Sequence, residues 1–435
     1  MAKTYESYKD SGIIWIGNIP QNWKIRKFQQ LCKIITDYVA SGSFADLRNN
    51  VSYLDEPDYA MLVRTTDLAN SSRSTEKVYI SKESYDFLNN SNLFGGEIIL
   101  PNIGSIGDAY LVPSDLYKKM SLAPNAIMFR TNQSDKFFYY YFLCDAGSNQ
   151  LKEIAASTAM PKFNKTQLRQ LNVVEPPLSE QQTIAAYLDE KCGEIDSLIS
   201  LQEEMISELQ AYKQSVITEA VTKGLDSNVP MKDSGVEWIG AIPKHWNVTR
   251  FKNVAKVKAN LVHPEDYLEM PQVAPDCIEK GSGKLIKYQT VREANVISDN
   301  HLFYKGQIVY SKIRPTLNKV IIAPFNGLCC ADMYPIETKE NLQFFLLQML
   351  SSVFNEQVAV VVQDRVKMPK INKEELDQII MICPPLSEQQ AIASYLDEKT
   401  SQIDSLIALK QEKITELKDY KKSIIYEYVT GKKKV

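Results

Sequence analysis

The chain carries PPLSEQQTIAAYLDEK at residues 176–191 and repeats it as PPLSEQQAIASYLDEK at residues 384–399. When the comparison is extended to residues 176–222 against 384–430, 31 of 47 positions are identical. Identity at this level over so long a stretch indicates an internal duplication. The fold is therefore expected to contain two copies of one structural unit.

Each copy of the repeated segment predicts a long helix. Its first residues, Ser179 with Gln182 and Ser387 with Gln390, have the spacing of a capping box. Apolar residues then recur at intervals of four and three, which is typical of helices packed along their length. These residues are Ile184, Leu188, Ile195, Leu198, Met205, Leu209, Tyr212 and Val216 in the first copy, and Ile392, Leu396, Ile403, Leu406, Leu417, Tyr420 and Ile424 in the second. We expect the two helices to pair, although each could instead lie flat on its own globular domain.

A second repeat precedes each of two dissimilar regions. KDSGIIWIGNIPQNWKIRKF begins at Lys9 and returns from Lys232 as KDSGVEWIGAIPKHWNVTRF. The regions that follow, residues 29–175 and 252–383, share only short stretches of similar sequence. This pattern predicts two related modules with one fold and two different surfaces.

The order of these segments predicts an α+β protein. Two homologous α/β globular domains would be joined by two long antiparallel coiled-coil helices. The first helix runs through a short linker into the second KDSG segment, whereas the chain ends carry the same two parts separately. Pseudo-two-fold symmetry therefore requires adjacent termini, with Tyr8 near Thr430. The expected domains are a globular domain at 1–175, a central helical spacer at 176–224, a second globular domain at 225–383 and a C-terminal helical spacer at 384–435.

The composition is that of an ordinary soluble protein. The 435 residues are 44% hydrophobic and 24% charged, and no apolar run approaches the ~20 residues needed to span a bilayer. The N-terminus has no signal-peptide core, and the seven cysteines form no C-x-x-C pair, which favours the cytoplasm. The net charge of −3 supplies no broad positive field, so a DNA-binding surface would have to collect its positive charge on one face.

Motifs of catalysis and metal binding are missing from the sequence. There is no G-x-x-x-x-G-K-[ST] for nucleotide phosphates and no H-E-x-x-H for zinc, and the three histidines have no metal-ligand spacing. The aromatic run at residues 137–142 predicts a buried helix rather than a surface on which bases stack. We therefore expect no catalytic residues and no metal site.

The duplicated KDSG…W-I-G…P…W and PPLSEQQ segments resemble those of the specificity subunits of type I restriction-modification systems, the HsdS family. The resemblance covers essentially the whole chain. It implies two target-recognition domains that each read one half of a split, asymmetric site in double-stranded DNA. It also implies helices that set the gap between the half-sites and dock methyltransferase subunits, two of which are expected, with restriction subunits as further partners.

The same resemblance implies a non-catalytic chain without a cofactor of its own. S-adenosylmethionine would act on the methyltransferase subunits, and ATP and Mg²⁺ on the restriction subunits. Two alternatives remain open from the residues. The chain could carry its own nuclease or methyltransferase site, or it could be a regulatory scaffold that binds methyltransferase subunits without reading DNA.

Two stretches inside the modules resemble the strand, turn and strand of the family's target-recognition domains. GGEIILPNIGSIGDAYLVP at residues 95–113 supplies Asn102 and Ser105, and Asn102 suits an adenine edge. GQIVYSKIRPTLNKVIIAP at residues 306–324 supplies the candidate DNA contacts Ser311, Lys312, Arg314 and Lys319.

A further shared stretch places a lysine at one position of both modules. MPKFNKTQL contains Lys162 and MPKINKEEL contains Lys370, and both suit phosphate contacts. The remaining candidate DNA-binding residues, for each of which a plain surface role is an equal alternative, are Arg64, Thr65, Thr66, Arg73, Lys165, Arg292, Arg365 and Lys367.

Overall fold

The computed structural model describes residues 4–69, 76–156, 160–365 and 367–435. Two compact units divide the chain. Unit 1 comprises Met1–Gln202 with Lys413–Val435, and unit 2 comprises Glu203–Glu412. Each unit holds one of the two dissimilar regions, called here module 1 (residues 29–175) and module 2 (residues 252–383), together with part of each long helix.

The two long helices are α7 (Leu178–Lys223) and α12 (Leu386–Val429). Both begin two residues earlier than the capping boxes predict, so the prediction that Ser179 and Ser387 are N-caps was wrong. The carbonyl of Pro177 accepts the N–H groups of Glu180 and Gln181 at 2.9 and 3.0 Å, and Pro385 repeats this arrangement. The serines consequently lie inside the first turn rather than ahead of it.

Within unit 1, α7 and α12 run antiparallel. The hydroxyls of Tyr187 and Tyr428 are 3.3 Å apart, and further along α7 the carboxylate of Asp196 lies 2.7 Å from the Lys421 amine. The residue number rises on one helix as it falls on the other, which defines antiparallel pairing. The predicted pairing of the two helices is therefore confirmed in this unit.

Unit 2 contains the same pairing between the other parts of α7 and α12. Lys213 lies 2.6 Å from Asp404, and these residues are the repeat equivalents of Lys421 and Asp196. Lys284 of module 2 also reaches Asp404, at 2.7 Å, and so ties the module to the helices. The shared core of helices and module includes Ile217, Ala220 and Val221 of α7 and Ile392, Ala393 and Leu396 of α12.

Not every apolar position of the predicted helix seam is buried. Ile184, Leu188 and Ile195 lie in the core of unit 1, but Leu198, Tyr212, Leu406 and Tyr420 are exposed. The strict spacing of four and three drifts around an α-helix of 3.6 residues per turn, so the outer members of the stripe turn away from the partner helix. The prediction that these four residues pack in the seam was wrong.

The two modules share one strand order. In module 1 the sheets have the orders β4-β11-β8-β9 and β6-β5-β10-β7, and in module 2 the matching orders are β16-β24-β21-β22 and β19-β18-β23-β20. The second sheet of module 2 has one additional strand, β17, beside β20. The strands of module 1 are β4 (Cys32–Asp37), β5 (Ala60–Val63), β6 (Tyr79–Ile80), β7 (Asn92–Leu93), β8 (Ile98–Pro101), β9 (Tyr110–Leu111), β10 (Met120–Leu122), β11 (Ala126–Thr131) and β12 (Asn172–Glu175). Those of module 2 are β16 (Ala255–Val257), β17 (Leu261–Val262), β18 (Pro271–Val273), β19 (Gln289–Thr290), β20 (Asn300–Phe303), β21 (Ile308–Ser311), β22 (Val320–Ile322), β23 (Gly327–Cys329), β24 (Met333–Thr338) and β25 (Ile380–Cys383). One parallel pair, β5 with β10 and β18 with β23, recurs among otherwise antiparallel neighbours.

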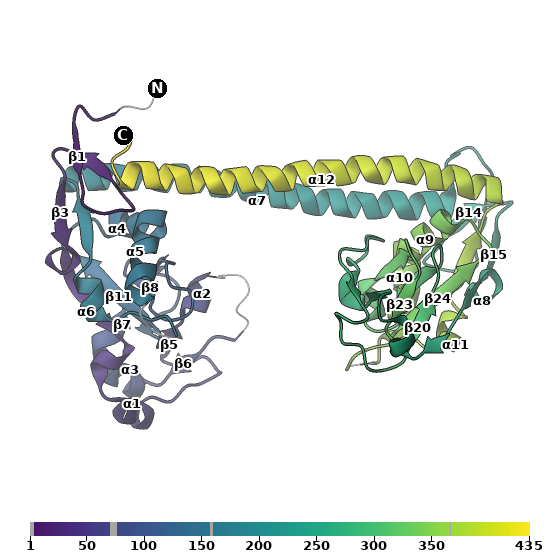
Figure 1. Ribbon diagram of the computed structural model, residues 1–435, viewed down its shortest axis with the longest axis horizontal. Coiled ribbons are helices and arrows are strands. Elements are labelled where there is room, and N and C mark those ends of the chain that lie inside the picture. The colour runs from purple at the N-terminus through teal and green to yellow at the C-terminus, as the bar shows by residue number, and fades with distance from the viewer. Residues whose placement is uncertain (1–3, 70–75, 157–159, 366) are drawn as a thin grey trace. The chain divides into compact units, whose positions relative to one another are not determined.

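Helices lie against these sheets within each module (Figure 1). Those of module 1 are α1 (Phe44–Asn50), α2 (Thr65–Ala69), α3 (Lys82–Phe87), α4 (Asp135–Leu143), α5 (Asp145–Ala155) and α6 (Lys165–Arg169), and module 2 has α9 (Leu342–Leu350), α10 (Ser352–Val362) and α11 (Lys373–Leu376), with α8 (Phe251–Val254) at its start. Five aromatic residues of α4 are buried, which confirms the prediction for the aromatic run. Among the described residues no single helix is long and apolar enough to cross a membrane, although α9 and α10 together pass that test as a bent pair.

The repeated KDSG segments form short strands that meet the long helices. They are β1 (Tyr8–Asp10), β2 (Asn18–Pro20) and β3 (Lys24–Lys27) in the first copy, and β13 (Met231–Asp233), β14 (Ala241–Pro243) and β15 (Asn247–Arg250) in the second. The indole N–H of Trp23 donates to Glu180 at 3.1 Å, and that of Trp246 donates to Glu388 at 2.8 Å. In both copies, the second tryptophan of the KDSG segment thus donates a hydrogen bond to the glutamate of the PPLSEQQ segment.

The N-terminal strand lies beside the C-terminal end of α12 (Figure 1). The Tyr8 hydroxyl lies 3.5 Å from the carbonyl oxygen of Lys432, and the Lys432 amine donates to the carbonyl of Ile16 at 2.8 Å. The hydroxyl of Tyr426 donates to the carbonyl of Trp15 at 3.2 Å. These contacts confirm the prediction that the two ends of the chain are adjacent.

Two buried tyrosines are expected to respond oppositely to loss of their hydroxyl. Tyr310 is fully buried, and its hydroxyl has no hydrogen-bond partner among the described residues. Tyr141 is equally buried, but its hydroxyl donates to Gln150 at 2.9 Å. Tyr310→Phe should leave the free energy of unfolding unchanged or raise it by about 1 kcal/mol, whereas Tyr141→Phe should lower it by about 1 kcal/mol. Urea unfolding measures both, and an equal loss in both variants would contradict an unpaired Tyr310 hydroxyl.

Candidate nucleic-acid interface

The turn that follows β8 is held by its backbone against two other segments of module 1. The N–H of Asn102 donates to the carbonyl of Asn125 at 3.1 Å, and the carbonyl of Asn102 accepts the N–H of Phe163 at 3.2 Å. An isolated antiparallel bridge joins Ile103 to Lys162. The turn, the residue before β11 and the Met-Pro-Lys stretch therefore meet at one place.

Module 2 has the same arrangement of two backbone hydrogen bonds and one bridge, called here a bracket, but different side chains. The N–H of Lys312 donates to the carbonyl of Asp332 at 2.9 Å, and the carbonyl of Lys312 accepts the N–H of Ile371 at 3.0 Å. An isolated bridge joins Ile313 to Lys370. We call these surfaces reading face 1 (residues 102–107, 125 and 162) and reading face 2 (residues 312–319, 332 and 367–370).

Several predicted residues are exposed on the reading faces. Lys162 and Ser105 are exposed on reading face 1, and Arg314, Lys367 and Lys370 are exposed on reading face 2. Within the described part of the chain, none of the four cationic side chains has an ion-pair partner. Arg314 has a φ of 44°, in the left-handed region that is unusual for a residue with a side chain, so the turn holds it in a conformation of higher energy.

The amide of Asn102 points into the protein rather than outward. Its Nδ2 donates to the carbonyl of Phe163 at 3.1 Å, and its Oδ1 is buried without a partner among the described residues. This orientation does not favour the predicted contact of the Asn102 amide with an adenine edge, which stays a prediction. The Asn102 side chain fastens the turn to the Met-Pro-Lys stretch.

Three predicted residues around the second turn also make internal contacts. Ser311 is buried and its hydroxyl donates to the carbonyl of Ile313 at 3.0 Å, and the Lys319 amine donates to the carbonyl of Pro275 at 2.6 Å. The Lys312 amine lies 5.2 Å from the centre of the Tyr334 ring, and its side chain is 17% exposed. Ser311 and Lys319 therefore support the turn, whereas Lys312 keeps limited access to solvent.

Four other predicted cations are engaged in ion pairs. The guanidinium of Arg64 binds the buried carboxylate of Asp67 at 2.8 Å, and the Lys165 amine lies 2.7 Å from Asp37. Arg292 pairs with Glu269 at 2.6 Å, and Arg365 pairs with Glu375. Thr65 and Thr66 open α2, and of these two threonines only Thr66 is exposed; Arg73 lies outside the described residues. Arg365 also donates to the carbonyl of Lys370 and so contacts the second bracket, whereas the other described residues of this group belong to neither bracket.

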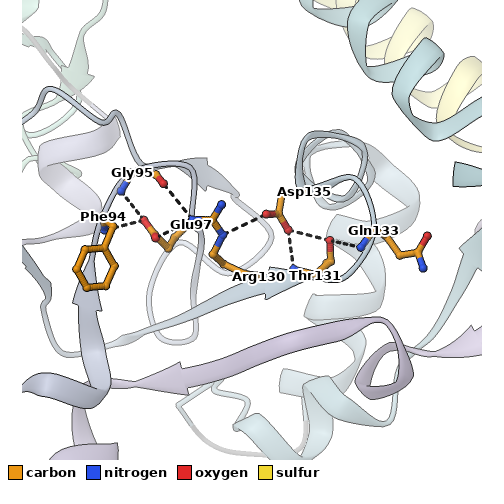
Figure 2. A network of polar contacts seen from close by, with 7 residues as sticks. All are labelled: Phe94, Gly95, Glu97, Arg130, Thr131, Gln133 and Asp135. Atoms are coloured by element: carbon orange, nitrogen blue, oxygen red, sulfur yellow. Dashed lines mark hydrogen bonds and ion pairs between the residues drawn. The ribbon is translucent and has the colours of Figure 1, made fainter. Parts of the chain in front are cut away.

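A polar network anchors the strand that leads into reading face 1 (Figure 2). The carboxylate of Glu97, almost fully buried, accepts the N–H groups of Phe94 and Gly95 at 3.2 and 2.8 Å and binds Arg130 at 3.1 Å. Arg130 also reaches Asp135 at the start of α4, at 3.2 Å. Since β8 runs from this network to the turn, the network fixes the strand's position at its first end.

Each module is then tied to its long helix by a buried glutamine. Gln181 accepts the N–H of Ser134 at 3.2 Å and donates to the carbonyl of Pro176 at 2.9 Å. Gln389 accepts the N–H of Asn341 at 2.8 Å and donates to the carbonyl of Pro384 at 2.9 Å. The repeated PPLSEQQ segment therefore orients each module on the helix that follows it.

Asn125 and Asp332 are the residues of the reading faces that sequence reasoning missed. Each immediately precedes a strand, β11 or β24, in a segment where the two modules share no recognisable sequence. Only the pairing of β11 with β8 and of β24 with β21 brings these residues beside the turns. An alignment of the two modules by predicted strands would have been the one available signal.

Comparison with known proteins identifies the family. The family model described as "Type I restriction modification DNA specificity domain" matches residues 20–211 and 243–419. The type I restriction enzyme EcoDI specificity subunit of Escherichia coli is 31% identical over 308 residues, which cover 67% of this chain and 69% of that protein. The type I restriction enzyme MjaIX specificity subunit of Methanocaldococcus jannaschii is 23% identical over 452 residues, covering 97% and 95%.

A solved structure supports the same fold. A chain from the work described as "Structural basis underlying complex assembly and conformational transition of the type I R-M system" aligns with a TM-score of 0.66 and 15% identity, over 94% of this chain and 98% of that chain. The two matched specificity domains agree with the antiparallel helix pairing and with the backbone bridges that recur in both modules. The chain belongs to the family of type I restriction-modification specificity subunits, and its role is DNA recognition without catalysis.

Proposed function

We propose that the two modules read the two halves of one asymmetric, bipartite site in double-stranded DNA. The observation that carries this proposal is the pair of matched brackets, which hold unlike side chains on the same backbone framework. Positions 102 and 125 are both asparagine, whereas the equivalent positions 312 and 332 are lysine and aspartate. Because base edges are recognised by their donors and acceptors, unlike side chains on equal frameworks favour unlike half-sites.

Reading also requires that each module be positioned on the duplex. Lys162 and Lys370 occupy equivalent places beside the two turns, and both side chains are exposed. A lysine at one position of both modules suits a contact that both modules need, and the phosphate backbone is the feature common to every DNA sequence. These two lysines are therefore proposed as phosphate contacts.

Substituting these lysines should weaken binding without changing the site that is read. Lys162→Ala and Lys370→Ala in the assembled complex are each expected to lower DNA affinity at all sequences and to reduce the salt dependence of binding by about one ion. Titrations of specific and random duplexes at several salt concentrations measure both effects. Lys191→Ala, a lysine of α7 that pairs with Glu194, serves as the control. A change in the preferred sequence would contradict a phosphate role.

The long helices carry two equivalent apolar patches that suit partner subunits. Patch 1 consists of Leu198, Leu201 and Tyr420 in unit 1, and patch 2 of the equivalent Leu406, Leu409 and Tyr212 in unit 2; all six side chains are between 46% and 61% exposed. Apolar side chains repeated at equivalent exposed positions favour two copies of one partner. We therefore infer one methyltransferase subunit on each patch.

The helix length is suitable for spacing two half-sites. An α-helix of 46 residues, the length of α7, rises ~69 Å, which exceeds the ~34–36 Å between half-sites one turn of B-DNA apart. S-adenosylmethionine is assigned to the methyltransferase subunits, ATP and Mg²⁺ to the restriction subunits, and the whole assembly to the cytoplasm.

A binding experiment separates this proposal from the scaffold alternative. The chain is assembled with its methyltransferase subunits. The complex is titrated with a duplex that contains the sequence it methylates, and with a random duplex of equal length. We expect at least ~10³-fold tighter binding to the specific duplex. Equal affinity for both duplexes would support a scaffold that does not read DNA.

A further inference from the structure

Reading face 2 contains one carboxylate among several cations. Asp332 lines an open hollow of about 540 Å³ together with Ile313, Arg365, Lys367, Met368 and Lys370. Its side chain is 49% exposed and forms an ion pair with the Lys312 amine at 3.9 Å, which is longer than a hydrogen bond. The carboxylate therefore keeps free acceptor capacity on a surface that otherwise favours an anion.

A carboxylate in this place is unfavourable unless it meets a hydrogen-bond donor on the DNA. It repels the phosphate backbone, so it adds nothing to general affinity. In the major groove, cytosine presents the N4 amino group as a donor, and Asp and Glu side chains accept from it. Adenine also has an amino group there, but its neighbouring N7 acceptor would repel the second carboxylate oxygen. Cytosine is therefore the base that matches Asp332 best.

The backbone of the bracket places a suitable donor beside this acceptor. The N–H of Lys312 donates to the carbonyl of Asp332 at 2.9 Å, so the backbones of the two residues are adjacent. The Lys312 side chain is 17% exposed and its amine lies 3.9 Å from the Asp332 carboxylate, which places the donor beside the acceptor. A lysine donates to O6 and N7 of guanine, which lie next to the N4 amino group of the paired cytosine. We propose that Asp332 and Lys312 together read one G·C base pair in the half-site of module 2, with Asp332 accepting from cytosine N4. This inference rests on the proposed function.

Reading face 1 offers a matched comparison. Asn125 occupies the position of Asp332, is exposed, and has a φ of 68° that asparagine tolerates better than most residues. The residue equivalent to Lys312 is Asn102, whose amide is turned inward. Module 1 therefore lacks both the carboxylate and the amine of this arrangement.

The test is the methylated sequence produced by Asp332→Asn in a host that expresses the chain with its methyltransferase. The substitution keeps the shape of the side chain but replaces a pure acceptor with an amide. We expect one G·C position in the half-site of module 2 to lose discrimination by about ten-fold or more, while the other half-site and the gap stay unchanged. Lys312→Met should relax the same position, and Asn125→Asp should alter only the half-site of module 1.

The outcomes separate this inference from the proposed function. If the wild-type chain directs methylation at no bipartite site, the proposed function fails. If it does so and Asp332→Asn methylates the same sequence with the same stringency, only the role of Asp332 fails. The role of Asp332 would also be overturned if the half-site read by module 2 of the wild-type chain contained no G·C pair. This outcome does not depend on whether a variant folds. A lower thermal stability with unchanged sequence preference would assign Asp332 a structural role instead.

Discussion

Replacing residues 252–383 with a copy of residues 29–175 is expected to convert the asymmetric methylation site into an inverted repeat of one half-site. Each module is joined to the start of its own long helix, and α7 and α12 run antiparallel in both units. Two identical modules should therefore read identical half-sequences on opposite strands. The half-sequence that disappears belongs to module 2.

Replacing one module by a copy of the other is feasible because the two modules make equivalent contacts with the long helices. Gln181 and Gln389 hold the first residues of α4 and α9, and Trp23 and Trp246 donate to equivalent glutamates. Lys284 of module 2 is an exception, since its ion pair with Asp404 would be lost. A chain with Lys284→Ala alone controls for that loss and should keep the wild-type site. An unchanged asymmetric site in the grafted chain would show that module 2 does not determine a half-site.

Placing a charge in both apolar patches is expected to abolish assembly with the methyltransferase. Leu198→Asp and Leu406→Asp each put a carboxylate where the proposed partner buries an apolar side chain, at a cost of about 2 kcal/mol or more, roughly thirty-fold in affinity at each site. Each single variant should bind one methyltransferase subunit instead of two. Light scattering of the purified complexes measures the stoichiometry.

Matched substitutions on the same helices control for a general effect of charge. Ser200→Asp and Ala408→Asp introduce the same carboxylate at exposed and equivalent positions outside the patches. Both should leave the stoichiometry at two. All four variants should keep the wild-type unfolding temperature, because the substituted side chains are exposed. Loss of one subunit with Ser200→Asp would place the docking surface elsewhere on the helices.

The repeats made the architecture predictable, because a duplication of this strength constrains the whole chain. Paired antiparallel helices, adjacent termini and two modules with one fold all follow from the order of the repeated segments. The helix starts did not follow, because Ser179 has the sequence of an N-cap but the helix begins at Leu178, where the carbonyl of Pro177 accepts the first N–H groups. The exposed residues Leu198 and Tyr420 were also missed, because a heptad pattern does not distinguish a seam from a neighbouring docking surface.

The candidate site was only partly predictable, since it depends on contacts between distant segments. The turn and the Met-Pro-Lys lysines could be found because both modules retain them. The inward amide of Asn102 depends on its contact with Phe163, which no local pattern reveals. Asn125 and Asp332 reach the turn only through strand pairing, and four of the other predicted cations pair with nearby carboxylates.

Single-molecule sequencing of methylated adenines, in a host that expresses this chain with its methyltransferase, tests the central claim most directly. Two unlike reading faces on two equivalent frameworks predict one methylated motif made of two different half-sequences with a constant gap. A single uninterrupted motif, a gap that varies between sites, or methylation that ignores sequence would contradict the claim that each module reads one half of a divided site.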